Sequence, residues 1–451
     1  MELQLIFPKH QEGKSLLQEH IPPLGLLTIA SYIKAKKPKQ KVEVFDGNSI
    51  SDNELIQKIN AEMVGISVWF SNYDNGLKIA KRIKEKNPNT KIVFGGPNTN
   101  GIAERILKNN HFIDFVISGD GEESLLGLLQ GRKNETIAGL TYRKDDKIIS
   151  NTPSYSLDLN KLPPLNLKLL KTPFKWDRKI KRMGHSYFPL SRYRGCFRAK
   201  RCQYCSIPLK ATRKSSSKNF WKDITNLNKK YGVDHFFETA DTFPLGELKS
   251  LAKSKPKNLK FKLRCYIAPS TINEDQIKLL SKIGVKQVFI GVENSRFYAD
   301  TNCTPISFKR YPDNYTSEDL LKEIDLFAKY NIDVMPSYVL GMPDETRESL
   351  KENIALIEKI ANKKNVSEMS INLCLPLPGS SYFLQCVSDS QVIKRYLEIK
   401  KQDIRTIDDF DIHLLSKLFI ERYSKVSYEE IVGEVKSFML KSKKNIAHWG
   451  M

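Results

Sequence analysis

The stretch RYRGCFRAKRCQYCSIP, residues 192–208, holds three cysteines in the spacing C-x5-C-x2-C. The two residues between Cys202 and Cys205 let both sulfur atoms reach one metal centre, and Cys196 closes the site from upstream. A structural zinc site usually has four protein ligands, whereas three thiolates suit a cubane iron–sulfur cluster with one iron open to a substrate. The spacing therefore predicts a metal centre in this loop, with an iron–sulfur cluster as the first interpretation.

Two features around the cysteines bear on this choice. Basic residues that would lower the thiol pKa and offset the negative charge of a cluster are Arg194, Arg198, Lys200 and Arg201. Zinc would need a fourth ligand from a distant part of the chain, and His185 and His235 are the candidates. A zinc site and a chance grouping of cysteines therefore stay open as alternatives.

Outward from this loop, apolar stretches of strand length alternate with helical ones. The strand-like stretches are 187–195, 235–241, 261–267, 287–293, 333–341 and 368–376. Their order predicts a partial (β/α)6 barrel over residues 181–385, with the cysteines in the loop after its first strand. Residues 386–451 are rich in lysine and amphipathic, so we expect a helical C-terminal region there.

The first 150 residues show a separate strand–helix alternation. The predicted strands are 2–7, 41–46, 63–68, 91–96 and 113–119, and the predicted helices are 22–36, 51–61, 73–86, 100–108 and one from Glu122. The pattern predicts an α/β domain over 1–150 with a doubly wound parallel sheet, whose ligand site lies at the carboxyl ends of the strands. A hairpin is expected at 138–151, and 151–180, with Pro163-Pro164, is expected to be an extended linker.

Composition narrows the class of protein. The 451 residues include 73 Lys and Arg against 51 Asp and Glu, a net charge of +22 that favours an anionic partner. No stretch reaches the ~20 apolar residues of a membrane span, and MELQLIFPKH predicts a first strand and not a signal peptide. Seven unevenly spaced cysteines do not form the pattern of a secreted disulfide framework. We therefore expect a cytoplasmic protein.

Together with the cysteine loop, three further segments resemble the radical S-adenosylmethionine enzymes. They are GVKQVFIGVENS (284–295), VMPSYVLGMPDET (334–346) and LPLPGSSY (375–382), in the order that this family shows. The first gap between cysteines is five residues, where the family most often has three. The resemblance implies a [4Fe–4S] cluster held by the three cysteines, with S-adenosylmethionine on the open iron.

The same resemblance implies which residues meet the cofactor. Tyr204 and the backbone up to Gly341 would lie by the adenosyl group, and Glu238 or Glu293 would hold its polar parts. For each carboxylate, the alternative is an ordinary residue at the end of a strand that does not contact the cofactor. One electron from the reduced cluster would yield a 5′-deoxyadenosyl radical, and the barrel would hold the substrate near it and exclude water.

The N-terminal half is similar to the cobalamin-binding domain of cobalamin-type radical enzymes. The similar segments are PPLGLLTIASYI (22–33), FGGPNTN (94–100), SGDGEES (118–124), GLTYR (139–143) and LPPL (162–165). The similarity implies cobalamin as a further cofactor, contacted by Gly25, Ser67, Gly95, Gly96, Pro97 and Gly119. The alternative is that these glycines only allow tight turns between a strand and the following helix. The D-x-H-x-x-G motif of another cobalamin class is absent, and neither His10 nor His20 recreates it.

Cobalamin and a radical cluster in one chain predict C-methylation at an unactivated carbon of a peptide or natural product. The alternative is peptide epimerisation with Cys374, on the predicted sixth strand, as hydrogen-atom donor, although a packing role would also explain this thiol. RNA modification fits the charge, but the methylthiotransferases of transfer RNA carry three N-terminal cysteines and none here precedes Cys196. A scaffold without chemistry is the remaining class. The expected partners are a peptide or anionic small-molecule substrate and an external one-electron reductant, with nucleic acid less favoured.

Overall fold

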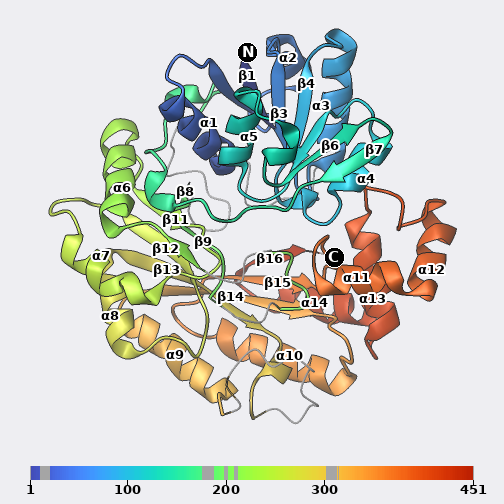
Figure 1. The fold of residues 1–451 in the computed structure, drawn as a ribbon. Helices are drawn as coiled ribbons and strands as arrows, with labels where there is room; N and C mark the ends of the chain where they lie inside the picture. The colour runs from blue at the N-terminus through green and yellow to red at the C-terminus, as the bar shows by residue number, and fades with distance from the viewer. Residues whose placement is uncertain are drawn as a thin grey trace. The chain divides into compact units, whose positions relative to one another are not determined.

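The computed structural model describes residues 2–10, 21–174, 187–197, 202–207, 212–300, 312 and 314–449, drawn in Figure 1. The chain divides into two compact units. Unit 1 comprises residues 1–177 and 403–410, and unit 2 comprises 178–402 and 411–451. Within the described segments, no helix combines the length and the apolar character that crossing a membrane requires.

A mostly parallel sheet forms the centre of unit 1. Its strands in the described residues are β1(Leu3–Phe7), β2(Val42–Asp46), β3(Met63–Ser67), β4(Lys91–Gly95), β5(Phe115–Ile117), β6(Leu140–Lys144) and β7(Lys147–Ser150). They follow the order β2-β1-β3-β4-β5-β6-β7, with β1 to β5 parallel and β6–β7 forming the predicted antiparallel hairpin. The order reverses between β1 and β3, which places a ligand site at the carboxyl ends of the strands. The predicted doubly wound α/β fold is confirmed.

The helices of unit 1 alternate with the parallel strands, as the sequence pattern predicted. They are α1(Leu24–Lys36), α2(Asp52–Lys58), α3(Tyr73–Lys86), α4(Ala103–Asn109) and α5(Gly121–Leu129). In α3 the buried residues Ile79, Ala80 and Ile83 recur at intervals of three and four, so one apolar stripe is covered while the lysines stay in water. Ser51 begins α2 by accepting a hydrogen bond from the Glu54 N–H.

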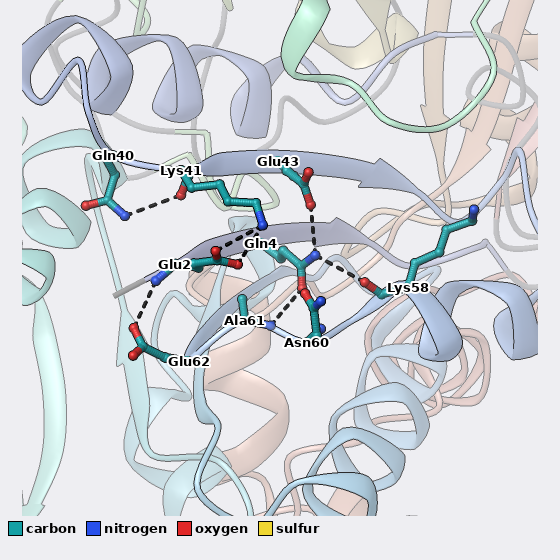
Figure 2. A network of polar contacts seen from close by, with 9 residues as sticks. All are labelled: Glu2, Gln4, Gln40, Lys41, Glu43, Lys58, Asn60, Ala61 and Glu62. Atoms are coloured by element: carbon teal, nitrogen blue, oxygen red, sulfur yellow. Dashed lines mark hydrogen bonds and ion pairs between the residues drawn. The ribbon is translucent and has the colours of Figure 1, made fainter.

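A buried glutamine joins β1 to the segment that leads into β3 (Figure 2). Gln4 is 3% exposed, and its Oε1 accepts hydrogen bonds from the N–H groups of Asn60 at 2.9 Å and Ala61 at 3.0 Å. Its Nε2 donates to Glu43 Oε2 at 2.9 Å and to the Lys58 carbonyl at 3.2 Å. One amide side chain therefore satisfies backbone groups that the sheet leaves unpaired at its amino-terminal edge.

Replacing Gln4 with alanine is expected to lower the free energy of unfolding of the full chain by about 2 kcal/mol, because two N–H groups lose their acceptor. Chemical denaturation of full-length protein measures this change. The control is Lys41→Ala, which removes only the exposed ion pair with Glu2 in the same network and should leave the midpoint in place. Equal midpoints for both variants would show that water replaces the glutamine at no cost.

A segment far along the chain completes unit 1. Residues 403–410 belong to it, and the Asp408 side chain, 6% exposed, accepts a hydrogen bond from Tyr73 Oη at 2.5 Å. The same carboxylate accepts from the side-chain amides of Asn109 and Asn110, both at 2.7 Å. Three donors on α3 and α4 therefore satisfy this buried carboxylate.

A second sheet, with parallel strands throughout, forms unit 2. Its strands in the described residues are β8(Phe188–Leu190), β11(His235–Glu238), β12(Lys262–Ile267), β13(Val285–Glu293), β14(Asp333–Leu340), β15(Glu368–Leu373) and β16(Asn445–Trp449). They follow the order β16-β15-β14-β13-β12-β11-β8. The six predicted barrel strands are confirmed, so the partial barrel holds. The expected helical C-terminal region is confirmed, and it ends in a strand that the sequence did not indicate, because β16 adds to the edge strand β15 in parallel register.

Helices follow the strands of unit 2 and then form the C-terminal region. They are α6(Ser217–Tyr231), α7(Leu248–Ser254), α8(Glu274–Ile283), α9(Ser317–Lys329), α10(Arg347–Ala361), α11(Ser381–Ser388), α12(Ser390–Lys400), α13(Ile412–Tyr423) and α14(Tyr428–Lys441). Capping boxes at Asn273, Thr316 and Thr346 fix where α8, α9 and α10 begin. Glu345, the residue before the cap of α10, holds the loop after β14.

Candidate active site

The cysteine loop follows the first strand of unit 2, as predicted. It leaves the sheet through the short strand β9(Tyr193–Arg194), and Cys196 Sγ lies 3.7 Å from Thr242 Oγ1 on the loop after β11. Cys202 and Cys205 lie in one turn, in which the Cys205 N–H donates to the Cys202 carbonyl at 3.0 Å. The Ile207 N–H donates to Cys205 Sγ at 3.4 Å.

The three sulfur atoms influence one another electrostatically. The pKa of Cys205 is raised to about 11, mainly by burial, and the charges of Cys202, Asp241 and Cys196 contribute in the same direction. The expected lowering of thiol pKa by basic neighbours is thus wrong for Cys205, since burial outweighs it. Of those neighbours, Arg198, Lys200 and Arg201 lie outside the described residues.

Three cysteine thiols are suitable ligands for an iron–sulfur cluster, although their sulfur atoms do not lie close together. None of the three cysteines forms a disulfide bond. No group of three His, Cys, Asp or Glu side chains in the described part of the chain stands close enough to hold a metal ion. Three thiolates in one part-buried loop repel one another, so a bound cation is what would draw them together. The zinc alternative gains no support, because His235 begins β11, whereas Cys196 lies beside Thr242 after the end of that strand, and His185 lies outside the described residues.

A buried carboxylate holds the stem of the cysteine loop. Glu238, at the end of β11, is 0% exposed and accepts hydrogen bonds from the N–H groups of Arg192 and Tyr193, both at 3.3 Å. Burial raises its pKa to about 8. The side chain of Arg192 pairs with Asp223 at 2.5 Å. Glu238 is fully buried and its carboxylate accepts hydrogen bonds from backbone N–H groups of the loop stem. We therefore propose that it positions the loop and does not contact S-adenosylmethionine.

A second buried carboxylate holds the loop after β14. Glu345 is 0% exposed, and its Oε2 accepts from the N–H groups of Gly341 and of Met342, the latter at 3.2 Å. Its Oε1 accepts from the side-chain amides of Asn294 at 3.3 Å and Asn353 at 2.6 Å. Burial raises the pKa of Glu345, and these donors oppose the rise. The sequence indicated only an acidic residue here, not this role.

The other predicted contacts of S-adenosylmethionine lie near these two carboxylates. Gly341 has a φ of +75°, and Glu293 has a φ of +65° at the irregular end of β13. A left-handed conformation is strained for a residue with a side chain and is typical of functional sites. Tyr204 lies in the cysteine turn, and its neighbour Gln203 accepts a hydrogen bond from the Tyr382 N–H at 3.2 Å. The assignment of Glu293 and Tyr204 to the cofactor remains a proposal.

Cys374 does not lie in an open part of unit 2. It follows the end of β15, is 0% exposed, and its N–H donates to the Leu340 carbonyl at 2.8 Å. Burial raises its pKa, followed by the charges of Cys386 and Glu345. These surroundings favour the packing role over hydrogen-atom transfer.

In unit 1 the predicted cobalamin contacts meet at one edge of the sheet. Ser67 ends β3, Gly95 ends β4 and leads into Gly96 and Pro97, and Gly119 follows β5. Their shared position is the carboxyl edge, where parallel sheets bind ligands. Gly25, in the first turn of α1, lies on the same side because α1 follows β1.

The glycines at this edge differ in whether the surrounding backbone leaves space for a side chain. A Cβ on Gly25 would meet nothing within 4 Å, and one on Gly95 would meet only the Ile117 carbonyl at 3.8 Å. At these two positions the packing of the fold does not itself require glycine, and space is left beside the backbone. A Cβ on Gly96 would lie 2.6 Å from the Val68 carbonyl, and one on Gly119 would lie 2.8 Å from the Ser154 carbonyl. For the latter two, the tight turn alone explains the glycine.

The sequence did not indicate the contacts of one polar residue at this edge. His10 follows β1, is 5% exposed, and its Nδ1 lies 2.7 Å from Ser71 Oγ on the loop after β3. Its backbone N–H donates to Asn48 Oδ1 at 3.1 Å. The side chain thus bridges the two strands between which the order reverses. His20, the other histidine considered, lies outside the described residues.

Two family models match the chain in the same order as the two sheets. The B12 binding domain matches residues 17–129, and the radical SAM superfamily matches residues 190–357. The second match includes all three cysteines and both buried carboxylates. The chain therefore combines a B12-binding domain with a radical SAM domain, which imply cobalamin, a [4Fe–4S] cluster and S-adenosylmethionine as cofactors.

Individual proteins are similar to the chain over much of its length. An uncharacterized methyltransferase of Pyrococcus horikoshii is 24% identical over 94% of this chain and 92% of its own. An anaerobic magnesium-protoporphyrin IX monomethyl ester cyclase of Synechocystis sp. is 23% identical over 65% of this chain and 61% of its own. The methyltransferase TsrM of Kitasatospora setae, solved with cobalamin and a [4Fe–4S] cluster, has a TM-score of 0.66 at 16% identity, covering 86% of this chain and 79% of that one. This last likeness shows a shared fold.

Proposed function

Because this chain is a cobalamin-type radical SAM enzyme, we propose that it transfers a methyl group from S-adenosylmethionine to an unactivated carbon of its substrate. The observation that carries the proposal is the presence of both domains in one chain: an intact three-cysteine loop, and a sheet edge at which Gly25 and Gly95 leave space beside the backbone. The naming of the Pyrococcus horikoshii relative and of TsrM as methyltransferases supports it.

The overall reaction balances with two molecules of S-adenosylmethionine and two electrons from an external one-electron reductant. One molecule gives up its methyl group and leaves S-adenosylhomocysteine. The other is cleaved to methionine and 5′-deoxyadenosine, which takes the hydrogen of the substrate C–H bond, and a C–CH3 bond forms in its place. The bound cluster and cobalamin would supply the one-electron chemistry and the methyl carrier.

The residues of this chain position and shield the reactants. Cys196, Cys202 and Cys205 would hold the cluster, and Glu238 fixes the stem of their loop through the backbone. Glu345 fixes the loop after β14 through the N–H groups of Gly341 and Met342. Holding both loops rigidly keeps the reacting atoms close, which is the main service a protein gives to a cofactor reaction.

Anaerobic reconstitution tests the proposal. We expect the full-length protein to retain about four iron atoms and a corrinoid, and to release S-adenosylhomocysteine only when cobalamin is present. The measurements are metal analysis, the optical spectrum and chromatography of the products. Iron without a retained corrinoid, or product formation that does not depend on cobalamin, would contradict methyl transfer. Zinc in place of iron would remove the radical chemistry altogether.

A further inference from the structure

The two faces of the sheet in unit 2 differ in exposure. On β12, Leu263, Cys265 and Ile267 are at most 3% exposed, whereas Tyr266 between them is 36% exposed. Helices follow the strands in a right-handed series, so they cover the outer face, and the residues of the other set line the inner face. Tyr266 and its register partner Phe289 on β13 therefore belong to the inner face.

Three rings on the inner face form what we call the aromatic shelf: Phe237, Tyr266 and Phe289. The rings of Tyr266 and Phe289 stack with centroids 4.9 Å apart and an interplanar angle of 27°. Phe237 lies 5.2 Å from Tyr266 and 5.5 Å from Phe289. Burial raises the pKa of Tyr266 to about 12 although part of its ring is exposed, as expected for a side chain deep in a concave surface with one open side.

The charge next to the shelf is already compensated. Arg264 lies one rung below on β12, 4% exposed, with its guanidinium 5.0 Å from the Phe289 ring centroid. Its Nη2 pairs with Glu368 at 3.5 Å. The rung that holds Tyr266, Phe289 and Met335 consists of uncharged side chains. Among the described residues, this part of the inner face therefore offers an anion no positive charge besides Arg264, which is already paired with Glu368.

The next two strands of the same face, β14 and β15, carry short polar side chains, which we call the polar wall: Ser337, Ser370 and Asn372. Ser337 and Ser370 are register partners on β14 and β15. Asn372 Nδ2 donates to Ser337 Oγ at 3.3 Å, and Ser370 Oγ donates to Asn372 Oδ1 at 3.1 Å. These bonds leave the hydroxyl proton of Ser337 and the lone pairs of Ser370 for a ligand.

The shelf lies beside the cysteine loop. The Tyr266 carbonyl accepts a hydrogen bond from the Phe243 N–H at 2.8 Å. Thr242, the preceding residue, is the one whose Oγ1 lies 3.7 Å from Cys196 Sγ. A ring placed on Tyr266 is therefore next to the part of the loop where the cluster would generate its radical.

We propose that the substrate is an uncharged, flat aromatic or heteroaromatic small molecule that stacks on the aromatic shelf and turns a polar edge to the polar wall. This inference rests on the proposed function for the reaction and adds the chemical class of its substrate. The net charge of the whole chain favoured a peptide or an anionic small molecule as substrate. We propose an uncharged substrate instead, because the residues that would bind its ring, Tyr266, Phe289 and Met335, carry no charge.

Binding of two matched probes to the anaerobically reconstituted full-length protein tests the inference. N-acetyl-tryptophanamide has a flat ring, and N-acetyl-cyclohexylalaninamide has an aliphatic one; saturation-transfer NMR gives both affinities. We expect the aromatic probe to bind more tightly. In Tyr266→Leu, which keeps apolar bulk, its affinity should fall about tenfold, and in Tyr266→Phe it should be kept. The control is Tyr330→Ala, at the end of α9, where the affinity should not change.

Equal binding of the two probes to the unaltered protein would overturn the inference without any variant. Loss of dithionite-driven 5′-deoxyadenosine formation in Tyr266→Leu at full iron content would also overturn it, because the ring would then serve the adenosyl group. Methyl transfer is not needed for binding. An aromatic preference without cobalamin-dependent S-adenosylhomocysteine would therefore contradict the proposed function alone and support this inference.

Discussion

Cys202→Ala protein is expected to lose the cluster and, with it, reductive cleavage of S-adenosylmethionine. Two thiolates cannot hold three irons of a cubane, and Cys202 is the buried member of the trio. Even changes next to metal ligands cost 10–100-fold, so loss of a ligand should lower cleavage by more than about a hundredfold. Iron content, the optical band of the cluster and the yield of 5′-deoxyadenosine measure the effect.

The matched control is another buried cysteine of the same unit. Cys265 lies on β12, is 0% exposed and faces the helix-covered side of the sheet. Cys265→Ala should keep its iron and its cleavage activity, with at most a loss of stability from the small cavity. If Cys202→Ala cleaves the cofactor as fast as Cys265→Ala, the assignment of the cysteine loop fails.

Glu345→Ala is expected to have the second largest effect. The change leaves four donors in the interior without their acceptor: the N–H groups of Gly341 and Met342 and the amides of Asn294 and Asn353. The free energy of unfolding should fall by about 3 kcal/mol or more. Because the loop after β14 would lose its shape, the KM of this variant for S-adenosylmethionine should rise. Its iron content should stay close to that of the unaltered protein.

Glu348→Ala serves as the control, since Glu348 lies in the first turn of α10 close to Glu345 in sequence but is exposed. Denaturation curves and the KM of this variant should match those of the unaltered protein. The account would be contradicted if Glu345→Ala unfolded at the same denaturant concentration as Glu348→Ala. Equal KM values would show that the carboxylate stabilises the fold without shaping the cofactor site.

The alternation of strands and helices made both sheets predictable. Strands such as Met63–Ser67 and Val285–Glu293 are short apolar runs between amphipathic helices, and this local pattern decides their structure. The cysteine loop was equally visible, because its ligands lie within ten residues of sequence. Local patterns therefore indicated the fold class and the three cysteines that we propose hold the cluster.

Contacts between distant segments left no such trace. β16, Asn445–Trp449, is a five-residue strand that exists because β15 offers it an edge. Asp408 joins unit 1 through Tyr73, 335 residues away, and a single aspartate has no periodic signature. The aromatic shelf depends on which face of β12 carries Tyr266, and that follows from register with β13 and not from the strand alone. Glu345 differs, because three of its four donors lie within eight residues, but the loop that holds them has no regular period.

The most direct test of the central claim is electron paramagnetic resonance of the reduced, anaerobically reconstituted protein, recorded before and after addition of S-adenosylmethionine. A cluster held by Cys196, Cys202 and Cys205 alone has one iron free to bind the added molecule. We predict a [4Fe–4S]+ signal whose g values shift when S-adenosylmethionine is added. A cluster signal that S-adenosylmethionine leaves unchanged, or a protein that holds zinc and gives no signal, would contradict the account.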